Sequence, residues 1–93
     1  MATILITAQC EDQAKWEAGF RTHADFFRSA YGITTPIGYG FGEDNYIGTC
    51  FETGDVAKFM AAIELPETAE AMEGDGLMQD TVQIFVLDKQ LAV

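Results

Sequence analysis

One histidine stands among the aromatic residues of a predicted helix. The segment KWEAGFRTHADFF covers residues 15–27, and its histidine is the only one in the chain. A helix turns by about 100° per residue, so the spacing of these aromatic side chains and of the histidine places them on one face. Imidazole titrates close to neutral pH, which makes a histidine in an apolar pocket a candidate general base. The residues on this face are Trp16, Phe20, His23 and Phe27.

Two interpretations of His23 remain open from the sequence. In the first, His23 is a general base or a hydrogen-bond partner for a ligand held between apolar walls. In the second, it is a core residue satisfied by one hydrogen bond with the backbone or a tyrosine, as most buried polar groups are. The three tyrosines either supply a second polar group or simply pack. The residues expected to contact a ligand are Trp16, Phe20, His23, Phe27, Tyr39 and Phe59, with His23 as the candidate catalytic residue.

A run of acidic residues is the second pattern that suggests a chemical site. Glutamates recur at every third residue from Glu64 to Glu73, and Asp75 and Asp80 follow them. Because Pro66 interrupts this run and no calcium-loop spacing is present, a solvated acidic face is preferred over a cation site. The chain also lacks a P-loop, a nucleophile elbow and a zinc-protease motif. We therefore expect neither a metal ion nor a cofactor.

The segment PIGYGFG, residues 36–42, leaves one face of a predicted strand almost without side chains. Pro36, Gly38, Gly40 and Gly42 alternate with larger residues. Such a face allows close approach of a backbone, a helix or a flat ligand. No helix follows directly, so the pattern is not a dinucleotide-binding fingerprint. Packing against a helix or a second chain is the preferred interpretation, and a ligand is the alternative.

Length and charge limit the class of protein. Ninety-three residues, of which 48% are hydrophobic, predict one globular domain over residues 1–93. A formal net charge of −10 repels nucleic-acid phosphates and anionic lipid head groups, so neither is an expected partner. The first residues lack the basic region and the length of a secretory signal, which predicts a cytosolic protein. Cys10 and Cys50 show no metal-ligand spacing and are predicted to be buried, reduced thiols.

Hydrophobic periodicity and capping residues predict the order of the elements. Asp12 is a plausible N-cap and Gly32 a plausible terminator of the first helix. Pro36 lacks a backbone N–H, so its strand is expected at the edge of the sheet. The predicted elements are strand 3–10, a helix of about 19 residues between Asp12 and Gly32, strands 33–41 and 46–53 joined by GEDN, a helix after Asp55, a short helix from Pro66 to GDG at 74–76, and strand 81–91.

The order strand, helix, strand, strand, helix, strand predicts an α+β, ferredoxin-like fold with a split β-α-β arrangement. Helices then cover one face of a four-stranded antiparallel sheet. The strands carry apolar side chains on both faces, as in IFVL at 84–87, whereas a sheet with one wet face alternates more strictly. A second copy of the chain is the simplest cover, so we expect a homodimer formed through the sheet faces.

Two segments resemble a known superfamily. They are KWEAGFRTHADFFRSAYGI at 15–33, with Trp16, Phe20, His23 and Ala24 in a W-x3-F-x2-H-A pattern, and DVAKFMAAIELPETAEAMEGDGL at 55–77. With the hairpin between them they resemble the dimeric α+β-barrel superfamily, which includes antibiotic-biosynthesis monooxygenases and stress-responsive barrel proteins. The resemblance implies a ferredoxin-like dimer with a pocket between the sheet and the first helix.

The resemblance implies several activities. Members of the superfamily include cofactor-free oxygenases of polycyclic phenols, lactone isomerases, haem-degrading enzymes and proteins without demonstrated activity. Haem degraders pair an asparagine with a histidine–tryptophan dipeptide, and this chain has only Asn45, in the hairpin turn, and no such dipeptide. Two hypotheses remain. The protein binds a small apolar or aromatic molecule without turnover, or it is a cofactor-independent monooxygenase or isomerase of a phenolic, polyketide-like substrate with His23 as general base.

Overall fold

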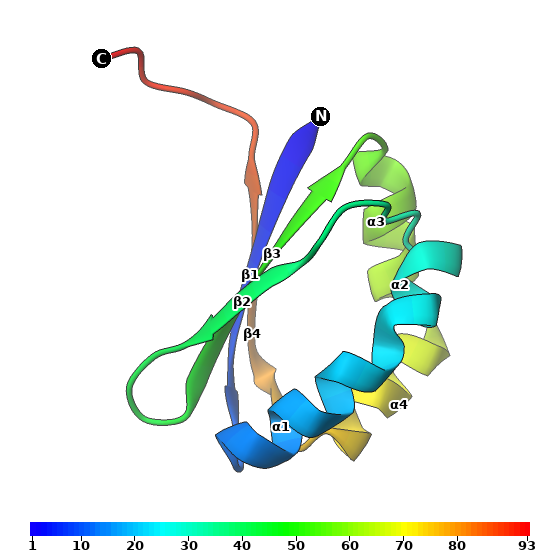
Figure 1. Cartoon of the computed structure of the whole chain (residues 1–93), viewed down its shortest axis with the longest axis vertical. Coiled ribbons are helices and arrows are strands. Elements are labelled where there is room, and N and C mark those ends of the chain that lie inside the picture. Colours follow the sequence, from blue (N-terminus) through cyan, green and yellow to red (C-terminus); the bar gives the residue numbers. More distant parts are fainter.

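A four-stranded sheet forms one layer of the molecule and the helices form the other (Figure 1). The structure is a computed structural model that describes residues 1–93. Its elements are β1 Ala2–Cys10, α1 Gln13–Phe20, a 3₁₀ turn Arg21–His23, α2 Ala24–Ser29, β2 Gly38–Phe41, β3 Tyr46–Thr53, α3 Val56–Ile63, α4 Pro66–Gly74 and β4 Leu77–Leu87.

The strands lie in the order β2-β3-β1-β4, and all neighbours are antiparallel. This arrangement is the split β-α-β topology of the ferredoxin-like fold, so the predicted fold class is confirmed. The strand β2 lies at one edge of the sheet, as predicted. Pro36 itself lies two residues before β2, outside the paired segment.

The core lies between the sheet and the helices. In β1, Ile4, Ile6, Ala8 and Cys10 are buried, while the residues between them are half-buried. In the same layer, Phe59 of α3 is fully buried. Figure 1 shows all helices on this side of the sheet and none on the other side. The sheet therefore has one covered face and one open face.

The predicted single first helix is wrong, because a 3₁₀ turn divides it into α1 and α2. Its start is as predicted, since Asp12 Oδ1 accepts hydrogen bonds from the backbone N–H groups of Ala14 and Lys15 at 2.8 and 3.1 Å. The hydroxyl of Thr22 donates to the carbonyl of Gly19 at 2.6 Å, a local bond that competes with regular helix geometry. His23 follows with φ −95° and ψ 10°, in the bridge region between helix and strand conformations.

The hairpin between β2 and β3 closes through a tight turn. Asp44 and Asn45 both have positive φ, 54° and 61°, and the backbone N–H of Tyr46 donates to the carbonyl of Glu43 at 3.0 Å. Two consecutive positive φ values are the signature of a type I′ turn, whose twist matches that of paired strands. This turn fixes the register in which Gly40 faces Gly48.

The second half of the chain follows the predicted pattern with one shift. The carboxylate of Asp55 accepts from the backbone N–H of Lys58 and caps α3, and Pro66 begins α4. The last strand begins at Leu77 and ends at Leu87, whereas the sequence predicted 81–91. An irregularity in the pairing opposite Thr7 and Gln9 lets β4 continue along β1 to this earlier start.

The two cysteines are free, as predicted, but only one is buried. The thiol of Cys10 lies in the core, and burial raises its pKa above the ordinary value, so it stays protonated at neutral pH. Cys50 is half-buried, which corrects the prediction of two buried thiols. It points to the open face because it alternates with buried residues of β3. No helix is long and apolar enough to cross a membrane.

Candidate functional site

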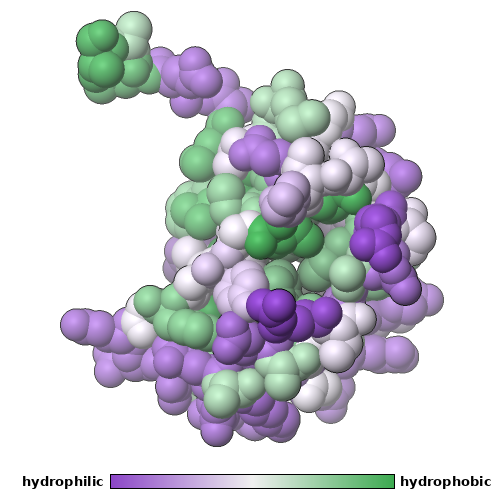
Figure 2. Space-filling model, in the orientation of Figure 1, coloured by the Kyte–Doolittle hydropathy of each residue, from purple (hydrophilic) through white to green (hydrophobic).

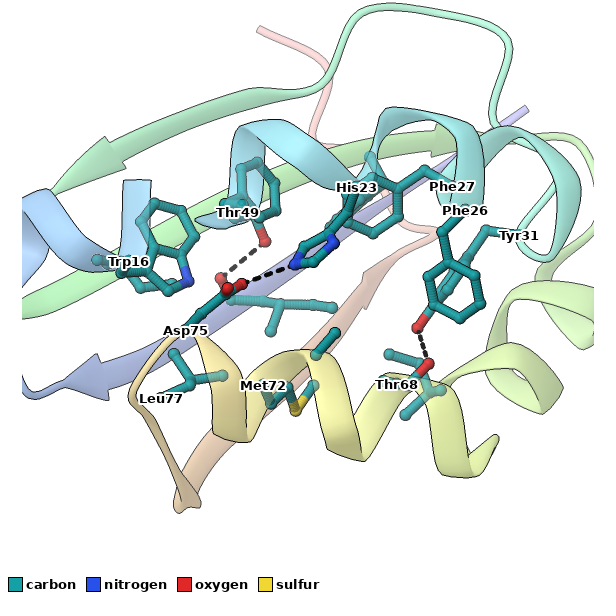
Figure 3. Close-up of a pocket in the computed structure, with 16 residues that line it drawn as sticks. Trp16, His23, Phe26, Phe27, Tyr31, Thr49, Thr68, Met72, Asp75 and Leu77 are labelled. Carbon is teal, nitrogen blue, oxygen red and sulfur yellow. Dashed lines mark hydrogen bonds and ion pairs between the residues drawn. The ribbon is translucent and has the colours of Figure 1, made fainter. Parts of the chain in front are cut away.

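A cavity of about 70 Å³ lies between the sheet, the first two helices and α4 (Figure 3). Most of its wall is apolar and much of it is aromatic. The polar side chains in the wall come from two threonines, a tyrosine, a histidine and an aspartate. The sixteen lining residues are Ile6, Trp16, Phe20, His23, Phe26, Phe27, Tyr31, Ile47, Thr49, Phe51, Ile63, Thr68, Ala71, Met72, Asp75 and Leu77.

A histidine–aspartate pair forms one end of this cavity. The Nε2 atom of His23 lies 3.0 Å from Oδ2 of Asp75, which is hydrogen-bond distance. The side chains are 24% and 10% exposed, so water reaches the pair only in part. Figure 3 shows the pair spanning from the 3₁₀ turn between α1 and α2 to the turn after α4, with aromatic residues beside it.

The position of Asp75 is held by the turn after α4. Its backbone N–H donates to the carbonyl of Ala71 at 3.0 Å as the last regular bond of the helix, and the next N–H, of Gly76, donates to the carbonyl of Glu73 at 3.1 Å. Gly76 follows with φ +76°, and its carbonyl accepts from the backbone N–H of Glu11 at 2.9 Å. A residue with a side chain rarely adopts this φ, so Gly76 allows the reversal. The turn is thereby tied to the end of β1.

Gly19 of α1 leaves the room that the contact between Asp75 and His23 needs. Gly19 provides the space for the carboxylate, because a Cβ atom at this position would overlap Oδ1 of Asp75. The 3₁₀ turn then places His23 one turn further along. The backbone geometry of α1 with its 3₁₀ turn, and of the turn after α4, thus brings His23 and Asp75 together.

The pairing determines which nitrogen of His23 is available to a ligand. A carboxylate accepts hydrogen bonds, so contact with Asp75 favours the tautomer that carries its proton on Nε2. The other nitrogen, Nδ1, then bears the lone pair. No hydrogen bond within the chain involves Nδ1 of His23. This nitrogen is also not among the buried polar atoms that lack a partner, so it is accessible. The arrangement can accept a proton at Nδ1 while Asp75 holds the ring and balances its charge.

A second polar link crosses the gap between the helices at the other end of the cavity. The hydroxyl of Thr68 donates to the carbonyl of Ala62 at 2.7 Å, so its oxygen accepts the proton of Tyr31, 2.6 Å away. Burial raises the pKa of Tyr31. Tyr31 is therefore a neutral, already engaged hydroxyl, unsuited to act as a second base.

The rest of the wall offers little further chemistry. The hydroxyl of Thr49 points to the carbonyl of Ile6 at 3.4 Å, within its own sheet. No group of three or more histidine, cysteine, aspartate or glutamate side chains is placed to hold a metal ion. Met72, from α4, contributes a flexible side chain to the apolar wall.

The structure brings together four of the six residues expected to contact a ligand. Trp16, Phe20, His23 and Phe27 all line the cavity. Phe59 does not, since it lies fully buried in the core behind Tyr31, with a ring-centroid distance of 5.0 Å.

Tyr39 also lies outside the cavity lining. It belongs to the edge strand β2 and packs edge-on against the rings of Trp16 and Phe20, at 5.7 and 5.4 Å. Its hydroxyl accepts from Arg21 Nη1 and donates to Glu17 Oε2, each at 2.7 Å. Tyr39 therefore supports the outer side of the aromatic wall.

Sequence reasoning missed Asp75 as the partner of His23. The two residues lie 52 positions apart, and Asp75 was grouped with the glutamates of the acidic run. The available signal was its position between Gly74 and Gly76, where a helix must end in a tight reversal. An acidic residue at such a point has a fixed direction, which distinguishes it from one on a solvated helix face.

Comparisons with known proteins place the fold. No protein-family model and no curated protein sequence matches the chain. Among solved structures, a Bordetella bronchiseptica protein provisionally described as an antibiotic biosynthesis monooxygenase superposes with a TM-score of 0.76 at 14% identity, covering 97% of each chain. SnoaB from Streptomyces nogalater, described as a cofactor-independent oxygenase, gives 0.68 at 14% identity, covering 99% of this chain and 95% of SnoaB. The chain has the fold of the antibiotic biosynthesis monooxygenase-like proteins.

A third similar structure supports the same assignment. A protein of Deinococcus radiodurans with the same provisional description gives a TM-score of 0.69 at 11% identity, covering 100% of this chain and 96% of that one. The resemblance inferred from the sequence to the antibiotic biosynthesis monooxygenase-like fold is thus confirmed. At these identities the likeness concerns the fold, and the chemistry has to be argued from the cavity itself.

Proposed function

We propose that the protein binds a small planar phenol or enol in this cavity and that His23 removes a proton from it. The observation that carries the proposal is the 3.0 Å contact between His23 Nε2 and Asp75 Oδ2 at the wall of an otherwise apolar cavity. A general base needs an oriented ring, a free nitrogen and a partner that stabilises its protonated form. Asp75 supplies the orientation and the stabilising charge.

The same step is the first one of a cofactor-independent oxygenase. Removal of a proton from an electron-rich phenol leaves an anion that can itself reduce dioxygen. For a methylene carbon conjugated with the phenol, the overall reaction R₂CH₂ + O₂ → R₂C=O + H₂O balances without a cofactor. An isomerase of the same substrate class returns the proton to a different carbon. SnoaB, described as a cofactor-independent oxygenase, motivates the first of these two outcomes.

A chromogenic phenol tests the proton transfer directly. We expect 4-nitrophenol, added near neutral pH, to show a larger phenolate absorbance when bound than when free. In His23→Gln the bound probe should remain neutral, because the amide cannot accept the proton. Asp75→Asn should give an intermediate phenolate fraction, since the ring stays but loses its orienting charge.

A matched control separates this effect from loss of binding. The Met72→Leu variant changes the wall but leaves the His23–Asp75 pair, so it should keep the wild-type phenolate fraction in the bound probe. Equal phenolate fractions in wild type and His23→Gln, with the probe bound in both, would contradict the proposal that His23 removes the proton.

A second candidate function is binding without turnover. The size of the cavity limits both functions alike, because about 70 Å³ is less than the roughly 150 Å³ that hold benzene in an engineered core. A ligand then enters only when side chains such as Met72 move. The lining favours binding without turnover, because it holds no free acid or base besides the His23–Asp75 pair and the hydroxyl of Tyr31 is already bonded to Thr68. In this case the probe binds with no change in its phenolate fraction in any variant.

We also propose that the protein is a homodimer formed through the open face of the sheet. Phe85 and Leu87 of β4 are 45% and 51% exposed there, beside the half-buried Leu5 of β1. Next to them, the glycines of β2 leave a shallow groove lined by Leu5, Thr7, Gly40 and Gly48, among others. Contiguous apolar surface of this kind is rare on monomers. A second copy would bury it through an isologous contact.

A further inference from the structure

An outer hollow lies beside the cavity, on the face between the helices and β2. Figure 2 shows a depression on this side of the molecule, with apolar atoms within and hydrophilic atoms at its rim. The hollow measures about 220 Å³. Its lining residues are Phe20, Arg21, Ala24, Phe27, Ile37 and Tyr39.

Two aromatic side chains separate the outer hollow from the inner cavity. Phe20 and Phe27 line both spaces, and their ring centroids lie 5.4 Å apart with the rings tilted by 53°. Both are half-buried. Because these two side chains border both spaces, rotation of a phenylalanine would join the spaces into one elongated site. A ligand longer than the inner cavity then extends into the outer hollow.

Arg21 is the only charged side chain in the lining of the outer hollow. One of its donors, on Nη1, is used by the hydroxyl of Tyr39 at 2.7 Å, and no carboxylate lies within ion-pair distance. Arg28, seven residues further along the chain, is by contrast paired with Asp25. A guanidinium presents five donors in a planar fork, which matches a carboxylate. Arg21 therefore keeps donors available at the rim.

We propose that the outer hollow is a subsite for an anionic substituent and that Arg21 selects ligands bearing a carboxylate there. This inference rests on the proposed function, because the aromatic body of the ligand occupies the inner cavity with its hydroxyl at His23. The ligand class is a planar aromatic hydroxy acid whose carboxylate lies at the end away from the reacting hydroxyl.

The charge around the subsite makes this selection depend on one residue. The chain carries a formal net charge of −10, which disfavours anionic ligands in general. Glu17 lies close by, since its carboxylate accepts from the hydroxyl of Tyr39 that Arg21 also contacts. Removal of the negative charge of Glu17 should strengthen carboxylate binding, and removal of the positive charge of Arg21 should abolish the preference.

Two probes that differ by one group test the subsite. We expect 6-hydroxy-2-naphthoate to bind roughly tenfold more tightly than 2-naphthol, the size of one charge-assisted contact. In Arg21→Gln the two affinities should become equal, and in Arg21→Lys part of the preference should remain. Arg28→Gln is the matched control and should keep the full preference. Glu17→Gln should increase it, and added salt should reduce it in wild type.

The outcomes separate the subsite from the proposed function. If 2-naphthol binds and the carboxylate gives no advantage, or if the advantage survives in Arg21→Gln, the subsite is refuted while the proposed function stands. If neither probe binds, the proposed function and the subsite are both refuted. A carboxylate preference that vanishes in Arg21→Gln but is unchanged in Arg28→Gln supports the subsite.

Discussion

The backbone of Gly19 in α1 leaves the space that the carboxylate of Asp75 occupies. A Cβ atom on Gly19 would overlap Oδ1 of Asp75, while Oδ2 of the same carboxylate lies 3.0 Å from Nε2 of His23. A residue without a side chain thus determines whether the pair can form. The cavity is built by close approach of α1 to the turn after α4, and its chemistry depends on that approach.

Replacement of Gly19 by alanine should separate the pair. Alanine favours a helix over glycine by about 1 kcal/mol, but displacement of Asp75 should outweigh this and leave the fold less stable. Nitrogen chemical shifts of His23, the only histidine, should change from one tautomer to a mixture. Gly74→Ala is the control, since Gly74 is helical with open space around it. It should gain stability and keep the wild-type shifts. Unchanged shifts in Gly19→Ala would contradict this role.

The energetic coupling between His23 and Asp75 can be measured in a double-mutant cycle. We expect His23→Phe and Asp75→Ala each to reduce the free energy of unfolding by roughly 1–3 kcal/mol, because each leaves a largely buried partner without its bond. The double variant should lose less than the sum, with a coupling of about 1 kcal/mol or more. Chemical denaturation provides the measurement, and strictly additive losses would show that the contact carries no energy.

Burial of Tyr31 makes the free energy of unfolding depend on pH in the alkaline range. Its pKa is raised in the folded chain, so the folded state holds the phenol proton more tightly than the unfolded state. This contribution to stability is fully present below the ordinary tyrosine pKa of about 10 and is lost as the pH rises through the folded pKa. Tyr31→Phe should therefore lose less stability than wild type between neutral and strongly alkaline pH.

A tyrosine on the surface is the control for this pH effect. Tyr46 is 44% exposed, and its hydroxyl makes no hydrogen bond within the chain. Tyr46→Phe should follow the wild-type pH profile in urea denaturation. If Tyr31→Phe and Tyr46→Phe give the same profile, burial of Tyr31 does not govern the alkaline loss.

The open face can be tested with a side chain that only a dimer would exclude. A Cβ atom on Gly40 meets nothing within 4 Å in the single chain. Gly40→Arg should therefore fold but sediment as a monomer, whereas wild type at micromolar concentration should sediment as a dimer. Gly54→Arg, at an equally open glycine in the turn before α3, should stay dimeric. A monomeric wild type would rule out the proposed assembly.

The fold could be predicted because local patterns and topology agree. Asp12 and Asp55 cap helices where predicted, and alternation placed the buried residues of β1 on one face. The break at Thr22 could not be read from periodicity. A 3₁₀ turn barely changes which side chains share the aromatic face of the helix, and the hydroxyl–carbonyl bond from Thr22 to Gly19 that accompanies it leaves no periodic signal.

The candidate site was only half predictable. Residues of one helix share a face by spacing alone, which is why Trp16, Phe20, His23 and Phe27 were grouped. The partner Asp75 depends on how α4 ends and how closely α1 approaches it, and neither follows from local pattern. Tyr39 was grouped with the ligand contacts because its type suited a phenol. Its place on the edge strand puts it behind the aromatic wall.

The protonation state of His23 in a complex with a bound phenol is the measurement that bears most closely on the proposed proton transfer. Nitrogen NMR reports which ring nitrogens of the single histidine carry protons, and at a pH where the ring of the free protein is neutral the proton should lie on Nε2. With 4-nitrophenol bound, both nitrogens should carry protons while the probe absorbs as its phenolate. A ring that stays neutral beside a bound, neutral phenol would contradict the assignment of His23 as the base.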